Sequence, residues 1–158
     1  MRSITVIIPV YNEVESLREL HNELSSVLNN TNKYELLFVD DGSSDGSIDL
    51  LKELSESDPH TKVIQFHRNY GKAAALAEGF KLSAGDYVVT MDADLQDDPA
   101  EIPNLVTKME NGYDLVSGWK QKRYDPITQT IPTKLFNWAA RRVSGIYLHD
   151  FNCGIKAY

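Results

Sequence analysis

The chain has 158 residues, of which 42% are hydrophobic and 25% are charged. This length and composition favour a single globular domain, residues 1–158, with a sizeable core. The net charge of −7 argues against a general nucleic-acid-binding protein, which would carry a basic surface. The single cysteine, Cys153, excludes a disulfide within the chain.

The two ends of the chain carry different signals. The N-terminal run MRSITVIIPV is too short for a secretory signal, and no stretch approaches the ~18 apolar residues of a membrane helix. The final residues, CGIKAY, read as the middle of an element rather than as a polar tail. We therefore expect the chain to be truncated at its C-terminus and to come from a longer protein.

Five short apolar runs predict β-strands. Most of them are continuous rather than alternating, which is typical of parallel strands covered on both faces. They are Ile4–Val10, Tyr34–Val39, Lys62–Phe66, Tyr87–Met91 and Tyr113–Gly118.

Segments with helical periodicity separate these runs. The first carries apolar residues every three or four positions from Val14 to Leu28. The second begins near Ser47 with Asp45 or Ser47 as its cap, the third runs from about Gly71 to Leu82, and the fourth begins at Pro99. This alternation predicts an α/β fold, a mostly parallel sheet with helices on both faces.

The informative residues follow the predicted strands, because ligands of such sheets bind outside the carboxyl ends of the strands. The four loops read PVYNE, DDGSSDG, HRNYGK and DADLQDD. All four are charged or rich in turn residues, so we expect them to form one site at one edge of the sheet.

The loop DADLQDD predicts a metal site. Asp92 and Asp94 fall on the same side of an extended chain, and two such carboxylates repel each other unless a cation lies between them. Their hard oxygen atoms suit Mg²⁺ or Mn²⁺, and Gln96 can add a neutral ligand. The alternative is a solvated turn before a helix, which we accept for Asp97 and Asp98.

The other loops allow two interpretations each. Asp41 can accept a hydrogen bond from a base or a ribose, or it can cap a local turn. Tyr11 can stack on a base, whereas Glu13 can simply start a helix. Arg68 and Lys72 flank a glycine at a helix start, where phosphate is readily bound, or are exposed surface charges.

The loops in this order resemble family 2 glycosyltransferases of the GT-A fold. The segments that carry the resemblance are VIIPVYNE, FVDDGSSDGS, RNYGKAAAL and VVTMDADLQDDP. It is closest to the branch that transfers sugars to polyprenyl phosphates, which includes dolichyl-phosphate mannosyltransferases. Two later segments, SGWKQKRYDP and LHDFNCGIKAY, are also similar to that branch.

The resemblance implies an inverting, metal-dependent enzyme of the cell envelope that works with a UDP- or GDP-linked sugar and a polyprenyl phosphate at the cytoplasmic face of a membrane. It implies that Pro9, Tyr11 and Glu13 line the nucleoside pocket and that Asp41 reads the base. Asp92, Asp94 and Gln96 would hold the metal and diphosphate, with Lys72 on a phosphate. The acceptor phosphate would meet Lys120, Lys122 or Arg123, and Asp150 would be the catalytic base if the acceptor is a sugar hydroxyl.

Three other functions stay open from the sequence: a phosphohydrolase, a receiver-type signalling module with Asp40 and Asp41 as its acidic pair, and a non-catalytic nucleotide-binding domain.

A basic segment favours the membrane interpretation. Residues 119–142 hold six basic residues against one acid, Asp125, with Phe136 and Trp138 among them. Such a segment suits anionic headgroups, although a core-packing helix with solvated cations has the same spacing.

Overall fold

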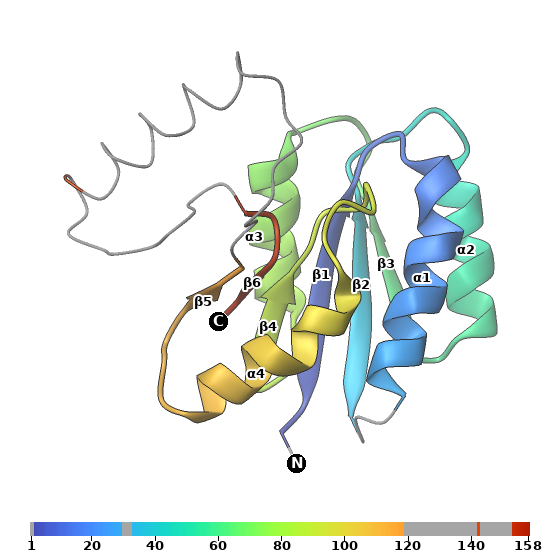
Figure 1. Ribbon diagram of the computed structural model, residues 1–158. Helices are drawn as coiled ribbons and strands as arrows, with labels where there is room; N and C mark the ends of the chain where they lie inside the picture. The colour runs from blue at the N-terminus through green and yellow to red at the C-terminus, as the bar shows by residue number, and fades with distance from the viewer. Residues whose placement is uncertain (1, 30–32, 119–141, 143–152) are drawn as a thin grey trace.

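The computed structural model describes residues 2–29, 33–118, 142 and 153–158 (Figure 1). The strands are Ile4–Val10 (β1), Tyr34–Asp40 (β2), Thr61–Gln65 (β3), Tyr87–Thr90 (β4), Val116–Ser117 (β5) and Lys156–Ala157 (β6). The helices are Val14–Leu28 (α1), Ser47–Ser57 (α2), Lys72–Leu82 (α3) and Ile102–Glu110 (α4), with a 3₁₀ turn, Pro99–Glu101 (η1), leading into α4.

The strands form one sheet in the order β3-β2-β1-β4-β6-β5. The strands β1 to β4 are mutually parallel, whereas β6 runs antiparallel to both β4 and β5. The mostly parallel sheet predicted from the sequence is therefore confirmed. The antiparallel edge was not predicted, and the fifth predicted strand shortens to Val116–Ser117, because two-residue strands leave no periodic pattern.

Helices cover both faces of the sheet, as the sequence indicated. One buried cluster joins the sheet to α1, α2 and α4 through residues such as Leu20, Leu51 and Ile102. A smaller cluster, around Ile7, Val39 and Ala75, joins the other face to α3. In Figure 1 the carboxyl ends of the parallel strands all lie at the top of the sheet.

The loops after β1 and β2 are hydrogen-bonded to each other, and these bonds start two helices. The backbone N–H groups of Glu13 and Val14 donate to Ser47 Oγ and Asp45 Oδ2 at 3.0 and 3.1 Å. Asp45 also accepts from the N–H of Ser47 at 2.9 Å. The prediction of Asp45 or Ser47 as the cap of α2 was wrong, because the N-cap is Gly46, at φ 97°, although Asp45 still accepts from the first N–H of the helix. These hydrogen bonds connect the two loops at the carboxyl ends of β1 and β2.

No helix among the described residues has the length and apolar character needed to cross a membrane.

Candidate functional site

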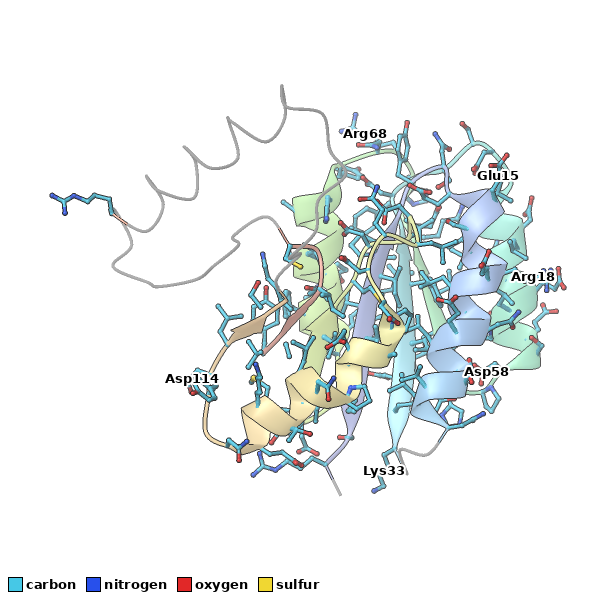
Figure 2. The ribbon with its side chains drawn as sticks, viewed as in Figure 1. Glu15, Arg18, Lys33, Asp58, Arg68 and Asp114 are labelled. Carbon is cyan, nitrogen blue, oxygen red and sulfur yellow. The ribbon has the colours of Figure 1, made fainter. Side chains whose placement is uncertain are left out.

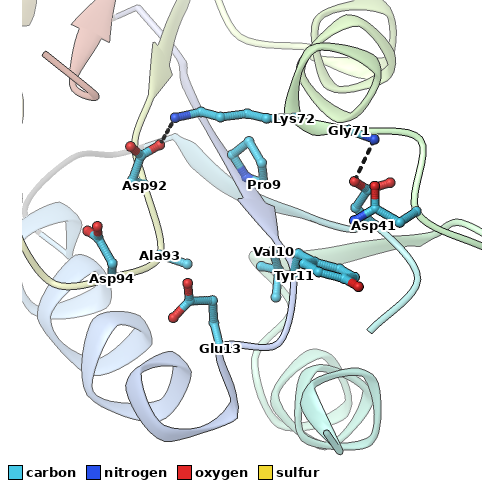
Figure 3. Close-up of a pocket in the computed structure, with 11 residues that line it drawn as sticks. Pro9, Val10, Tyr11, Glu13, Asp41, Gly71, Lys72, Asp92, Ala93 and Asp94 are labelled. Atoms are coloured by element: carbon cyan, nitrogen blue, oxygen red, sulfur yellow. Dashed lines mark hydrogen bonds and ion pairs between the residues drawn. The ribbon is translucent and has the colours of Figure 1, made fainter. Parts of the chain in front are cut away.

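A cavity of about 320 Å³ opens at the carboxyl ends of β1, β2 and β4 (Figure 3). It includes seven residues predicted for the site, namely Pro9, Tyr11, Glu13, Asp41, Lys72, Asp92 and Asp94. Four further lining residues were not predicted: Val10, Asn69, Gly71 and Ala93. The third predicted metal ligand, Gln96, is exposed and is not part of this lining.

Proline in β1 explains why the sheet opens here. Ile7 O accepts from the N–H of Met91 on the β4 side, whereas Val10 O accepts from Asp41 on the β2 side. Directions alternate along a strand, so Pro9 faces β4, where it has no N–H to donate. Pairing between β1 and β4 accordingly ends at Ile7 and Thr90. Beyond that point the two strands separate, and the cavity lies between their ends.

The aspartates after β4 lie on one wall of this opening. Asp92 accepts an ion-paired hydrogen bond from Lys72 at the start of α3, as Figure 3 shows. Asp94 is exposed and accepts from the N–H of Gln96 at 3.1 Å, which closes a tight turn. Leu95 inside this turn has φ 59°, an unusual conformation for a residue with a side chain. Such strain is often kept where a loop must hold functional groups in place.

The electrostatics of the cavity favour a cation. Glu13 points toward Asp94 in Figure 3, and its pKa is raised above the usual value by burial and by repulsion from Asp94, with smaller contributions from Asp45 and Asp92. A positive ion between these carboxylates would remove that repulsion. The only cation lining the cavity in the described part of the chain is Lys72.

The carboxylates of the cavity fit a hard divalent ion whose remaining ligands come from the substrate and from water. Among the described residues, no three His, Cys, Asp or Glu side chains converge as a ready-made metal cluster. Asp92 and Asp94 would therefore supply the protein ligands, and phosphate oxygens and water would complete the shell. Mg²⁺ is commonly bound in this way, through one or two carboxylates together with substrate phosphates.

Asp41 is held by the neighbouring loop. Its two carboxylate oxygens accept from the backbone N–H groups of Tyr70 and Gly71 at 2.7 and 2.8 Å, and the residue is only 3% exposed. Gly42, at φ 72°, lets that loop approach, because a Cβ there would lie 2.5 Å from the carbonyl carbon of Arg68. Asp41 therefore holds the loop after β3 rather than capping its own turn, where the N–H of Ser43 donates to Asp40 instead. Asp41 also lines the cavity with acceptor capacity to spare, and its contact with a base stays a prediction.

Gly154, just before β6, allows an equally close approach on the other wall. A Cβ at Gly154 would lie 2.5 Å from Asp97 Oδ2 and 2.8 Å from Asp92 Oδ2. Asp97 is buried, whereas Asp98 accepts from the N–H of Ala100 and caps η1. The helix-start role predicted for Asp98 is thus confirmed. The solvated position predicted for Asp97 was wrong, because nothing in the sequence indicates that β6 returns beside it.

Two further candidates, Arg68 and Asp40, do not line the cavity. Arg68 stacks on the ring of Tyr70, with its guanidinium carbon 4.9 Å from the ring centroid, at the same end of the molecule as the strand termini (Figure 2). Asp40 is fully buried, and both carboxylate oxygens of Asp41 accept from backbone N–H groups, an arrangement that does not favour the phosphorylated acidic pair of the receiver alternative. Asp150, Lys120, Lys122 and Arg123 lie outside the described residues.

Known proteins are similar to this chain in sequence and in fold. The chain matches the family model of Glycosyl transferase family 2 over residues 5–156. It is 41% identical over 160 aligned residues to the undecaprenyl-phosphate 4-deoxy-4-formamido-L-arabinose transferase of Salmonella choleraesuis (strain SC-B67), covering 100% of this chain and 49% of that protein. The chain therefore spans about half the length of the curated relatives that it matches.

Two solved structures show the same fold. One is a mannosyltransferase from Pyrobaculum calidifontis in complex with GDP-Man and Mn²⁺, with a TM-score of 0.75 at 23% identity over 99% of this chain and 44% of that chain. The other is the glucosyl-3-phosphoglycerate synthase of Mycobacterium tuberculosis in complex with Mn²⁺, UDP and phosphoglyceric acid, with a TM-score of 0.76 at 23% identity over 99% of this chain and 55% of that chain. The architecture is that of the GT-A fold, and the chain belongs to glycosyl transferase family 2.

Proposed function

We propose that this chain is the donor-binding part of an inverting glycosyltransferase that moves a sugar from a UDP- or GDP-linked donor to a polyprenyl phosphate. The observation that carries the proposal is the single cavity that joins Tyr11 and Asp41 to Lys72 and to the Asp92–Asp94 pair. Its acidic wall suits a metal-bound diphosphate, and its ring and buried carboxylate suit a nucleoside. The named function of the Salmonella relative supports the polyprenyl phosphate acceptor.

Different residues of the cavity have separate proposed roles in binding the metal, the phosphates and the base. Asp92 and Asp94 would hold Mg²⁺ or Mn²⁺, which when bound neutralises charge on the departing nucleoside diphosphate. Lys72 and the N-terminus of α3 lie opposite, where the helix dipole also favours phosphate oxygens. Tyr11, which is half exposed, offers its ring to the base. Gln96 stays a proposed ligand that would have to turn inward from its exposed position.

The acceptor determines whether a catalytic base is needed. The second ionisation of a phosphate monoester lies near pH 6. A polyprenyl phosphate is therefore largely a dianion at neutral pH and can attack the anomeric carbon without losing a proton first. Asp150 remains the proposed base only for a hydroxyl acceptor.

Calorimetric titration of the chain with UDP and with GDP, each with and without Mn²⁺, tests the donor assignment. We expect binding of one nucleotide to be much tighter with Mn²⁺. Binding of neither nucleotide under any condition would contradict the proposal. Tight binding without transfer in the full-length protein would instead indicate a nucleotide-binding domain without activity.

A substitution at Gly154 tests whether Asp92 needs the close approach of the backbone at Gly154, which leaves no room for a side chain. We expect Gly154→Ala to weaken Mn²⁺-dependent nucleotide binding about tenfold, because the added Cβ displaces Asp92 Oδ2 from its position. Gly85→Ala is the matched control, because its Cβ would make an equally close contact, 2.5 Å from the backbone N of Thr5, at the opposite end of β1 from the cavity. Equal nucleotide affinities for the two variants would show that Asp92 does not need this close approach.

The proposal includes a membrane surface, through the basic residues of segment 119–142. Each basic residue near an anionic surface contributes about 1 kcal/mol to binding. We therefore expect the chain to co-sediment with vesicles containing an anionic lipid at low salt, and to be released at high salt. Neutral vesicles are the control. Equal, salt-independent sedimentation with both kinds of vesicle would contradict a headgroup-binding surface.

A further inference from the structure

A second cavity of about 280 Å³ lies between α3, β4 and β6, directly beside the first. The two cavities share Lys72 and Asp92, so the ion pair between these residues forms a common wall. The second cavity also contains Lys156 of β6, and its apolar wall includes Leu76, Met91 and Tyr158.

The two cavities on either side of that wall differ in the charge of the side chains that line them. Among the described residues that line the first cavity, the charged side chains are Lys72 and four carboxylates, Glu13, Asp41, Asp92 and Asp94. Among those that line the second, they are Lys72, Lys156 and Asp92. A divalent ion bound to Asp92 would compete with Lys72 for that carboxylate, so the ammonium group of Lys72, which lies on the common wall, could contact phosphate oxygens on either side. A divalent ion at Asp92 therefore makes the second cavity more favourable for an anion.

The apolar wall of the second cavity continues to the protein surface. Leu76 and Phe80 lie one turn apart on α3 and so share a face of the helix. The ring of Phe80 packs edge-on against Tyr158 with centroids 5.0 Å apart. Two lysines in the cavity and aromatic rings beside it are complementary to an anionic head with an apolar chain.

We propose that the second cavity is the binding site for the acceptor phosphate, with Lys156 and Lys72 as its cationic contacts and the Leu76–Phe80–Tyr158 surface under the first part of the chain. This inference rests on the proposed function, because it takes the polyprenyl phosphate as the occupant. It places the acceptor next to the diphosphate, on the opposite side of Asp92. The acceptor phosphate would thus contact Lys156 of β6 and Lys72 of α3, in addition to the predicted Lys120, Lys122 and Arg123.

The test titrates the chain, saturated with Mn²⁺ and the preferred nucleoside diphosphate, with farnesyl phosphate, farnesol and inorganic phosphate. We expect Lys156→Gln to weaken farnesyl phosphate binding about tenfold or more, the usual effect of losing one charge-assisted hydrogen bond. The nucleotide affinity should not change. Lys108→Gln, which removes an exposed lysine from α4, is the matched control and should change neither affinity.

Two further comparisons make the result specific. Phe80→Ser should weaken farnesyl phosphate but leave inorganic phosphate binding unchanged, because only the former has an apolar chain. Farnesol should bind Lys156→Gln and the parent chain equally. Equal farnesyl phosphate affinity for Lys156→Gln, Lys108→Gln and the parent would overturn the site.

Failure of the site can be separated from failure of the proposed function. In the full-length protein, transfer to polyprenyl phosphate with an unchanged acceptor KM in Lys156→Gln would sustain the function and overturn the site. Selective loss of farnesyl phosphate binding in Lys156→Gln, in a protein that transfers sugar to no polyprenyl phosphate, would sustain the site and overturn the function.

Discussion

Replacing Asp94 by asparagine is expected to lower the Mn²⁺-dependent affinity for nucleoside diphosphate about a hundredfold. Removing an outer-shell partner of a metal ligand typically lowers metal affinity about 10–100-fold. Removing the charge of a ligand itself should have an effect at the upper end of that range. Asparagine keeps the oxygen that accepts from the N–H of Gln96, so the turn around Leu95 should survive. Titration with and without Mn²⁺ measures the effect.

The control for Asp94→Asn is Asp114→Asn. Asp114 is an exposed acid between α4 and β5, far from the strand ends that form the cavity (Figure 2). It reports the effect of removing one negative charge from the whole molecule. The metal assignment would be wrong if Asp94→Asn and Asp114→Asn bound the nucleotide equally well, or if a chelator left the affinity of the parent chain unchanged.

The sequence predicted the sheet and much of the cavity because both depend on local patterns. Buried parallel strands produce continuous apolar runs, and the residues at their carboxyl ends meet on one edge whatever the details of packing. The runs before Asp41 and Asp92 were therefore enough to bring these two residues together. Pro99 likewise marked the start of the 3₁₀ turn η1, whereas the α-helix α4 begins three residues later, at Ile102.

The features that were missed depend on contacts between distant segments. Asn69 lines the cavity because its loop is held by Asp41, a contact that spans the sheet edge and leaves no periodic signal. Gly154 matters because β6 returns beside β4, which places a glycine against Asp92 and Asp97. The only available signal was a glycine in CGIKAY directly before a short apolar segment.

The structure also changes what a substitution at Asp41 should do. The carboxylate holds the loop that carries Asn69 and Lys72, so removing it affects the protein and the ligand together. Asp41→Ala leaves the N–H groups of Tyr70 and Gly71 without their acceptor. An unpaired group of this kind costs about 1–3 kcal/mol. Because water reaches this partly exposed loop, we expect a total loss of about 2–4 kcal/mol in the free energy of unfolding, measured by urea denaturation.

Comparing two ligands separates loosening of the loop from loss of a base contact. Pyrophosphate with Mn²⁺ meets the metal and Lys72 but has no base, whereas the nucleoside diphosphate meets Asp41 as well. If Asp41 reads the base, Asp41→Ala should weaken the nucleotide by about tenfold more than it weakens pyrophosphate, the value of one hydrogen bond to a charged group. Asp41→Asn should show the same excess with a smaller loss of stability, because its amide oxygen still accepts from one of the two backbone N–H groups. Equal weakening of both ligands would mean that Asp41 acts only by holding the loop after β3. The base would then be recognised by other groups in the cavity, of which the exposed ring of Tyr11 is the first to test.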